Sequence, residues 1–224
     1  MKAGSTRIRS ADDVVPLHEI AGPAGRLEAL LDEPSHGTGG LRAAVVFGHP
    51  HPQYGGTMHT KVVYQAAKAL GRIGCAVLRF NFRGVGRSAG SFADGVGEAD
   101  DFRAGLEFMR ERYPPARLWA AGFSFGSWVA LAAGASDAGV SALIGIAPPV
   151  THYDFETVAA STKPKFFIQG ERDEICPLKE MQLFYARCEE PKELVVIDGA
   201  DHLFDGKTTE VGDTIEDLLG DWSA

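Results

Sequence analysis

Short, mostly apolar runs alternate with helical apolar stripes along most of the chain. In the run Ala43–Phe47 every residue is apolar, as expected of a strand that is buried on both faces. Later runs are predicted as strands of the same kind, at residues 75–80, 118–121, 142–147, 165–169 and 194–197. Because such strands are joined by right-handed helical crossovers, this order predicts an α/β fold with a doubly wound, mostly parallel sheet and helices on both faces.

The clearest helical stripe lies in Glu98–Arg112. Its apolar residues Ala99, Phe102, Leu106 and Met109 recur at helical spacing. Acidic residues stand in its first turn and arginines in its last, which is the order that the helix dipole favours. Similar spacing predicts helices at residues 57–70, 125–135, 179–187 and 208–222. These helices supply the crossovers between the predicted strands.

The chain begins with a different pattern. Val14–Ile20 and Arg26–Leu31 are typical of two short strands around the turn Gly22–Gly25, which predicts an N-terminal antiparallel hairpin. A loop is predicted at residues 35–40. Because we find no internal repeat, low-complexity tract or linker, we expect a single domain over residues 1–224.

The composition is that of a globular protein. The 224 residues are 45% hydrophobic and 23% charged, and the formal net charge is −8. An acidic chain repels nucleic acid and anionic membranes, so neither is an expected partner. The three cysteines are too few, and odd in number, for a disulfide framework, and none has the spacing of a zinc ligand.

No segment has the pattern of a targeting signal or a membrane span. The N-terminal residues lack an apolar run of signal-peptide length. The longest apolar run, Trp128–Ala135, is far shorter than the roughly 18 residues that a membrane-spanning helix needs. We therefore expect a cytoplasmic protein, in which a Cys176–Cys188 disulfide is not expected.

The loops that follow the predicted strands carry the candidate chemistry, because ligands bind at the carboxyl ends of the strands in such sheets. The segment Gly122–Gly126 reads Gly-Phe-Ser-Phe-Gly and lies between an apolar strand and an apolar helix. This context is typical of a nucleophile elbow, in which a sharp turn exposes a serine hydroxyl. We predict Ser124 as the nucleophile. The alternative is a plain strand–helix turn made of small residues.

A serine hydroxyl needs a base, and the base needs a group that orients it. His202 and Asp173 each follow a predicted strand, and serine, aspartate, histidine is a known order of triad residues along a chain. We predict His202 as the general base and acid, and Asp173 as the residue that orients its ring. Glu174 is the alternative to Asp173, and Asp201 is expected to cap its own loop.

Two backbone N–H groups are needed to stabilise the oxyanion of an acyl transfer. The first candidate is the amide of Phe125, next to the predicted nucleophile. The second is expected in the loop Gly48–Gly56. Within its His-Pro-His-Pro stretch only His49 and His51 can donate, because proline has no N–H. We predict His51, since it lies farther past the end of the strand.

The same loop offers a rival interpretation, a metal site made of His49, His51 and His59. No carboxylate is spaced to complete such a site. We therefore expect neither a metal nor another cofactor.

The loop Asn81–Ser88 is rich in glycine but lacks the pattern of a nucleotide-binding loop. We expect it to pack beneath the predicted elbow. Arg83 is expected to pair internally, because a buried arginine needs a partner.

Five stretches resemble the α/β-hydrolase superfamily in sequence and in order. They are His49–Val63, Phe80–Gly90, Ala121–Ala130, Gly170–Pro177 and Asp198–Gly206. They are most similar to a branch of small bacterial hydrolases near the dienelactone hydrolases. The resemblance covers about residues 14–222, and it implies the α/β-hydrolase fold with a serine triad and ester chemistry.

Two residues depart from the pattern of these relatives. Dienelactone hydrolases carry a cysteine in the elbow where this chain has Ser124, which favours ordinary ester chemistry. In the closer branch an asparagine is usual where this chain has Thr60, at a position expected to support the oxyanion loop.

The superfamily often carries a cap domain, or lid, after the strand that follows the elbow helix. Here only Pro148–Pro164 separates that strand from the next, with room for one short helix at residues 153–160. We therefore expect no cap domain and an open site, which suits small acyl groups. The predicted substrate contacts are Tyr54, Phe123 and Tyr153.

Together these features predict a serine hydrolase that cleaves small carboxylic esters through an acyl-enzyme. An acyltransferase or a peptidase with the same triad is the alternative, and a non-catalytic binding module is a third interpretation. A small-molecule ester is the expected partner. The sequence leaves the natural ester and the oligomeric state open, a homodimer included.

Overall fold

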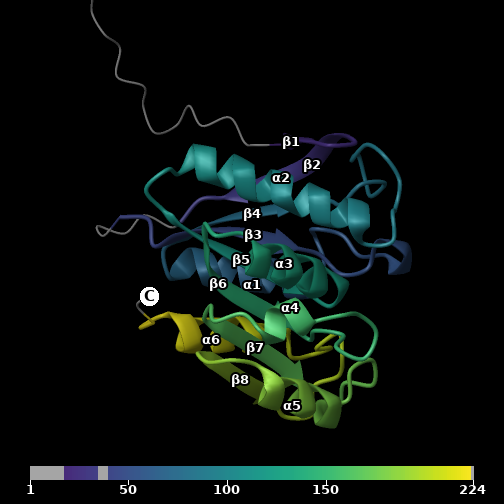
Figure 1. Cartoon of the computed structure of the whole chain (residues 1–224), viewed down its shortest axis with the longest axis vertical. Coiled ribbons are helices and arrows are strands. Elements are labelled where there is room, and N and C mark those ends of the chain that lie inside the picture. The colour runs from purple at the N-terminus through teal and green to yellow at the C-terminus, as the bar shows by residue number, and fades with distance from the viewer. Residues whose placement is uncertain (1–17, 35–39, 223–224) are drawn as a thin grey trace, which may run out of the picture.

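One eight-stranded sheet forms the centre of the molecule (Figure 1). The computed structural model describes residues 18–34 and 40–222. The strands lie in the order β1-β2-β4-β3-β5-β6-β7-β8. Their bounds are β1 Glu19–Gly22, β2 Gly25–Asp32, β3 Ala43–Gly48, β4 Cys75–Phe80, β5 Arg117–Phe123, β6 Val140–Ile146, β7 Lys165–Gly170 and β8 Lys192–Ile197. β2 pairs antiparallel with both β1 and β4, and all strands from β4 across to β8 are parallel.

Helices cover both faces of this sheet. They are α1 Lys61–Arg72, α2 Val96–Arg112, α3 Phe125–Ser136, α4 Glu156–Ala159, α5 Leu178–Arg187 and α6 Thr208–Leu219, with a short 3-10 turn, η2, at Pro52–Tyr54. α1 and α6 pack on one face, and α2 to α5 pack on the other. In Figure 1, α2 and α3 lie in front of the strands and α1 lies behind them. The predicted fold class is thereby confirmed.

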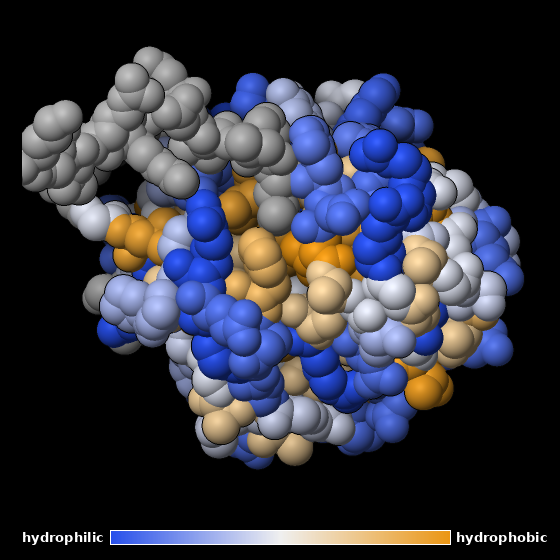
Figure 2. Space-filling view, turned by 90° about the horizontal axis from the view of Figure 1, so that it is seen from above, coloured by the Kyte–Doolittle hydropathy of each residue, from blue (hydrophilic) through white to orange (hydrophobic). Residues whose placement is uncertain are grey.

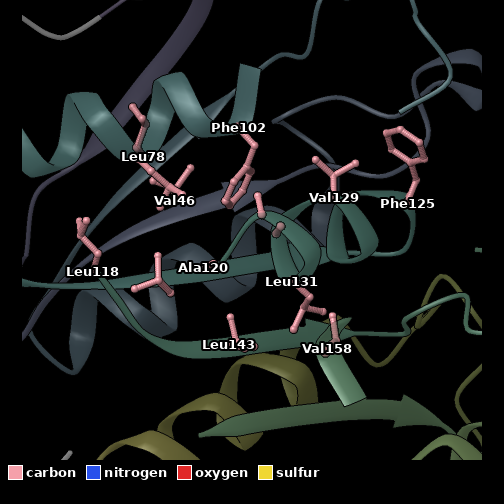
Figure 3. Packing of buried hydrophobic residues seen from close by; sticks show 14 of the residues in the cluster. Val46, Leu78, Phe102, Leu118, Ala120, Phe125, Val129, Leu131, Leu143 and Val158 are labelled. Atoms are coloured by element: carbon pink, nitrogen blue, oxygen red, sulfur yellow. The ribbon is translucent and has the colours of Figure 1, made fainter. Parts of the chain in front are cut away.

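The central strands are buried because both of their faces are covered. Every residue of β3, β4 and β7 is buried. Successive residues point to opposite faces, so that Val46 and Leu78 join the core under α2 and α3, whereas Val45 and Val77 join the core under α1 and α6. Figure 3 shows Val46 and Leu78 beside Phe102 of α2.

Two helices begin at other residues than predicted, and local hydrogen bonds explain both differences. α1 begins at Lys61 rather than Thr57, because the preceding residues form a turn in which the Thr60 N–H donates to the Thr57 carbonyl at 3.0 Å. α2 begins at Val96 rather than Glu98. The Glu98 carboxylate accepts a backbone N–H from just before the helix at 2.8 Å, so that it caps the helix from inside.

The closing helix α6 ends at Leu219 rather than at Trp222. The Arg42 guanidinium donates to the carbonyl oxygens of Leu219 and Trp222, and to that of Gly220 at 2.6 Å. These bonds satisfy carbonyls that a helix end leaves without partners. Trp222 then packs on Trp119 with the two rings 5.4 Å apart.

The N-terminal hairpin forms the first edge of the sheet. β1 has four residues and pairs with β2 through Ile20 and Leu27. Residues 14–17 of the first predicted strand and residues 35–39 of the predicted loop lie outside the described residues. Seen from above, toward this edge, the surface is mostly hydrophilic around an apolar area in its middle (Figure 2). A short edge strand with a charged residue such as Glu19 disfavours pairing with a further strand.

The chain between β6 and β7, residues 147–164, builds α4 alone. The indole N–H of Trp128 in α3 donates to the Asp154 carbonyl at 2.9 Å, which ties this link to the body of the fold. The prediction that no cap domain covers the sheet is therefore confirmed. None of the helices in the described part of the chain has the length and apolarity to cross a membrane.

Three glycines allow β3, β5 and α3 to come into backbone contact. Gly48 of β3 pairs in register with Gly122 of β5. A Cβ atom on Gly126, in the first turn of α3, would lie 2.3 Å from the His49 carbonyl oxygen and 2.4 Å from the Gly48 carbonyl carbon. A Cβ atom on Gly122 would lie 2.2 Å from the Gly126 carbonyl oxygen. The turn between β5 and α3 is thus held directly against the loop that follows β3.

This contact predicts that Gly126→Ala destabilises the protein. The clash is with backbone atoms, which no side-chain rotation relieves, so we expect a loss of about 1–3 kcal/mol in the free energy of unfolding. The matched control is Gly71→Ala in α1, where an added Cβ meets nothing within 4 Å. That change is expected to stabilise by about 0.5–1 kcal/mol, because alanine favours the helix. Denaturant unfolding of both variants measures the difference, and equal stability would refute the interpretation.

Candidate active site

Ser124 occupies the sharp turn between β5 and α3. Its backbone has φ 54° and ψ −127°, a strained conformation for a residue other than glycine. The turn is held because the Ser124 N–H donates to the Ile146 carbonyl at 2.9 Å, while the Ser124 carbonyl accepts from the N–H and the hydroxyl of Ser127 at 2.8 and 2.6 Å. This is the strand–turn–helix geometry expected of a nucleophile elbow, which presents the serine hydroxyl at the end of the sheet.

His202 and Asp173 reach Ser124 from the two strands at the far edge of the sheet. His202 follows β8, and its Nε2 lies 2.8 Å from the Ser124 Oγ. Asp173 follows β7, and its Oδ2 lies 2.8 Å from the His202 Nδ1. The structure thus brings the three residues into one row of hydrogen bonds. Because the carboxylate faces Nδ1, it favours the tautomer in which Nε2 is free to accept the serine proton.

Asp173 is held by more than the histidine. Its side chain is buried, and its Oδ1 accepts the backbone N–H groups of Ile175 and Cys176, each at 2.8 Å. Oδ2 also accepts from the side-chain amide of Gln169 at 2.9 Å. Four donors therefore surround one carboxylate and hold its orientation. Glu174, the alternative to Asp173, is exposed.

Gln169 is a site residue that the sequence reasoning missed. Its side-chain amide donates to Asp173 and, at 2.8 Å, to the Cys176 carbonyl, and the residue is fully buried near the end of β7. The available signal was a polar residue directly after the apolar run Phe166–Ile168, because a buried amide needs a partner. Asp201, expected to cap its loop, accepts the Asp205 N–H at 3.0 Å.

The prediction that Phe123 contacts substrate is wrong. Its side chain is fully buried in the core under α1 and α6. Strand alternation turns this last residue of β5 into the core, so that its ring supports the His202 ring from within at 5.6 Å and packs on Phe204 at 6.2 Å.

Tyr54 is exposed and Tyr153 is half-buried at the surface beside the site. Tyr54 is 86% exposed, with its ring 4.7 Å from the ring of His51. Tyr153 stacks on Trp128 at 4.3 Å and lies 5.8 Å from Phe125. Burial raises the pKa of Tyr153, and the nearby Tyr54 raises it further. The two tyrosines therefore lie within electrostatic reach of each other, and their contact with substrate stays a prediction.

The two predicted oxyanion donors are backbone amides at neighbouring segments. Phe125 is the first residue of α3, where the N–H groups have no partner within the helix. The ring of His51 lies 4.8 Å from the ring of Phe125. In the described part of the chain, neither of these two backbone N–H groups is hydrogen-bonded to a protein acceptor. Both remain available for an oxyanion.

The loop between β3 and α1 is anchored by residues of β4 and the segment after it. The Asn81 side chain accepts the Met58 N–H at 2.9 Å, and Arg79 donates to the Met58 carbonyl at 2.9 Å. Thr60 Oγ1 accepts the Thr57 N–H at 3.3 Å, so it supports the loop, as expected of this position.

The expected internal pairing of Arg83 is confirmed. Its guanidinium meets the fully buried Asp101 at 2.7 and 3.0 Å, and its backbone N–H donates to the same carboxylate at 2.9 Å. This two-point contact fixes the glycine-rich loop after β4 on α2. Phe82, near the start of the same loop, lies with its ring 5.9 Å from that of Phe125, next to the elbow.

The three cysteines and His49 lie in the interior of the protein. Cys75, Cys176 and Cys188 are all buried and free, and burial raises their thiol pKa values to about 12, 11 and 11. No set of three His, Cys, Asp or Glu side chains is grouped as a metal site within residues 18–34 and 40–222. Both ring nitrogens of His49 are occupied by hydrogen bonds within the protein.

The sequence is similar to a known family and to a protein of another bacterium. The family described as serine aminopeptidase, S33, matches residues 40–159. An uncharacterised protein of Rickettsia prowazekii, RP471, is 37% identical over 207 residues, covering 88% of this chain and 86% of its own.

Several solved structures are similar to this chain over most of its length. An α/β serine hydrolase homologue from Coxiella burnetii is 36% identical with a TM-score of 0.83, over 96% of this chain and 100% of that one. XC6422 from Xanthomonas campestris, described as a serine hydrolase without lid, is 38% identical with a TM-score of 0.84, over 91% and 92% of the two chains. Est1E of Butyrivibrio proteoclasticus, in a structure with bound ferulic acid, shares the fold at 19% identity, with a TM-score of 0.78 over 90% and 97% of the two chains.

The nearness to dienelactone hydrolases stays a prediction. The two solved structures at 36% and 38% identity are described as a serine hydrolase homologue and a serine hydrolase without lid, and this fold is lidless too. The chain belongs to the α/β serine hydrolase superfamily, in its lidless bacterial branch.

Proposed function

We propose that the protein hydrolyses small carboxylic esters through an acyl-enzyme formed on Ser124. The observation that carries this proposal is the row of hydrogen bonds from the Ser124 hydroxyl through His202 to the buried Asp173, at 2.8 Å for each step. Such a row is what an activated serine nucleophile needs.

The reaction follows from the positions of the protons. The Ser124 Oγ attacks the ester carbonyl while the His202 Nε2 takes the hydroxyl proton. The resulting imidazolium is stabilised by Asp173 across the Nδ1 hydrogen bond, and it then gives the proton to the departing alkoxide. Water repeats the sequence on the acyl-enzyme, which releases the acid and restores the serine.

The charge that develops on the carbonyl oxygen is met by backbone amides. The Phe125 N–H points from the N-terminus of α3, where the helix dipole also favours a negative charge. The His51 N–H supplies the second donor from the loop after β3. Losing one such donor typically costs about 3–4 kcal/mol of transition-state stabilisation.

The surroundings of the site support small esters. No cap domain encloses it, and large apolar side chains are exposed in the loops at the carboxyl ends of the strands: Tyr54 after β3, Ile175 after β7 and Leu203 after β8. Such side chains offer apolar contact to a short acyl or alkoxy group, without a deep enclosure for a long chain. Esterases among the solved structures of the same fold support this choice.

Peptide cleavage is the second candidate, because the matching family is described as a serine aminopeptidase. An aminopeptidase needs a carboxylate that binds the free ammonium group of its substrate. Two carboxylates lie within electrostatic reach of His51, Glu98 and Asp94. Glu98 is fully buried and already accepts two backbone N–H groups at 3.0 and 2.8 Å, so it is engaged within the fold. Asp94 is exposed, and it is the carboxylate that peptide chemistry would use. Aminoacyl p-nitroanilides, assayed beside p-nitrophenyl esters, separate the two activities.

Replacing the nucleophile tests the proposal directly. We expect the wild-type protein to hydrolyse p-nitrophenyl esters from acetate to dodecanoate with a preference for short chains. Ser124→Ala is expected to lower kcat by about 10⁴-fold or more, with folding intact, because no other group in the row can attack the carbonyl. Turnover that survives in the folded variant would contradict the proposal.

The assignment of the acid makes a separate prediction. Asp173→Asn places an NH₂ group among four donors and removes the charge that stabilises the imidazolium, so kcat is expected to fall by about 10³- to 10⁴-fold. The matched control is Glu174→Gln, which changes the neighbouring exposed carboxylate and is expected to leave kcat within about twofold of the wild type. Steady-state kinetics gives kcat for each variant, and circular dichroism checks that each variant is folded. A larger loss in Glu174→Gln would reverse the assignment.

A further inference from the structure

His49 is a histidine that the proposed reaction does not use directly. It follows β3, is fully buried, and packs its ring 4.7 Å from the ring of Phe82. It lies two residues before His51, whose amide is the second oxyanion donor in the proposed function. A buried polar ring at this place needs an explanation in terms of its partners.

The partners of His49 define its protonation. The Phe82 backbone N–H, which can only donate, lies 3.0 Å from the Nε2. The Pro50 carbonyl, which can only accept, lies 2.6 Å from the Nδ1. The Nδ1 therefore carries the proton and the Nε2 carries a lone pair. Burial lowers the pKa of His49 to about 4, so the ring stays neutral and this tautomer persists at neutral pH.

The bond to Pro50 sets the direction of the next amide. The Pro50 carbonyl and the His51 N–H belong to one peptide unit. That unit is trans, because Glu190–Pro191 is the cis peptide found among the described residues. In a trans peptide the C=O and the N–H point in opposite directions. A carbonyl held toward the buried His49 ring therefore turns the His51 N–H away from the core.

Gly56 packs against the Pro50 carbonyl from another side. A Cβ atom at Gly56 would lie 2.0 Å from the Pro50 oxygen, and the Gly56 N–H donates to the His51 carbonyl at 3.1 Å. The Pro50 carbonyl is thus confined between the His49 ring and the backbone of Gly56. Rotation of the peptide unit is restricted from both sides.

We infer that His49 is a positioning residue, which holds the Pro50 carbonyl and thereby aims the His51 N–H at the oxyanion. The inference rests on the proposed function, because it assigns a role to that amide. His49 does not touch substrate. It fixes in advance a dipole that the transition state needs, so that no reorganisation is required when charge develops.

A pair of substitutions separates the two hydrogen bonds of His49. In His49→Asn the side-chain NH₂ takes the place of Nδ1 and keeps the bond to Pro50, but the acceptor for Phe82 is lost. In His49→Gln the amide oxygen takes the place of Nε2 and keeps the bond from Phe82, but the donor to Pro50 is lost. Each variant loses one buried hydrogen bond, so similar losses of stability are expected.

Catalysis is expected to distinguish the two variants. His49→Gln should lower kcat by about 10- to 100-fold with KM nearly unchanged, as weakening one oxyanion donor does, whereas His49→Asn should retain most of the wild-type kcat. Equal losses of kcat, or the larger loss in His49→Asn, would overturn the inference, because a purely structural role depends on both bonds alike.

A second variant reaches the same carbonyl without touching His49. Gly56→Ala presses a methyl group on the Pro50 oxygen and is expected to lower kcat by about tenfold or more while KM stays nearly constant. Gly71→Ala serves as the control and should leave both constants unchanged, since its surroundings are open. An unchanged kcat in folded Gly56→Ala would count against the inference.

The tautomer of His49 gives a readout that needs no substrate. Nitrogen NMR of the labelled wild-type protein between pH 5 and 8 should show a neutral ring protonated at Nδ1. A ring protonated at Nε2 has no Nδ1 proton to donate to the Pro50 carbonyl. That result would refute the inference, whatever activity the protein shows. A wild-type protein that hydrolyses no ester of the series would instead refute the proposed function, and the spectrum would still decide whether His49 holds the carbonyl.

Discussion

The site depends on the backbone contact between Gly126 and the end of β3. Gly48 and Gly122 are in register on neighbouring strands, and Gly126 in the first turn of α3 touches the carbonyl groups of Gly48 and His49. Because no side chain separates these segments, the nucleophile turn and the loop with the second amide form one rigid unit. The distance between Ser124 and the proposed oxyanion donors is then set by the backbone of the sheet and not by flexible side chains.

Two histidines near Ser124, His49 and His202, have different surroundings, and we propose different roles for them. His202 lies between the Ser124 hydroxyl and the Asp173 carboxylate at the end of the sheet, which is the position that the proposed reaction gives to its general base. His49 lies in the core between a backbone donor and a backbone acceptor, and burial keeps it neutral. In our proposals the ring of His202 moves a proton, and the ring of His49 holds a peptide group. The second role needs a ring that stays neutral, and the burial of His49 provides it.

The sequence was most informative where strands end. Ser124, Asp173 and His202 could each be found as a polar residue in a loop after an apolar run, and the structure brings the three together. The fold class followed from the alternation of strands and helices, because that alternation leaves few ways to bury both faces of a sheet. The pairing of Arg83 followed from the cost of burying a charge alone.

Features that depend on the exact direction of a side chain could not be predicted from the sequence in this way. Phe123 and Tyr54 are both aromatic neighbours of the site in sequence, but one points into the core and the other into solvent. The contact of Gln169 with Asp173, and that of His49 with Pro50, depend on where β7 and β3 end to within one residue. The start of α1 at Lys61 depends on a turn held by Thr60, which apolar spacing alone does not record.

The most direct test of the central claim is to find where a serine-directed reagent binds. The protein is incubated with a fluorophosphonate, and the adduct is located by mass spectrometry of proteolytic peptides. The account predicts one equivalent of phosphonate on Ser124, because its hydroxyl lies 2.8 Å from the His202 Nε2 and beside backbone N–H groups that have no protein acceptor among the described residues. The absence of an adduct, or an adduct on a different residue, would contradict the claim that Ser124 is an activated nucleophile.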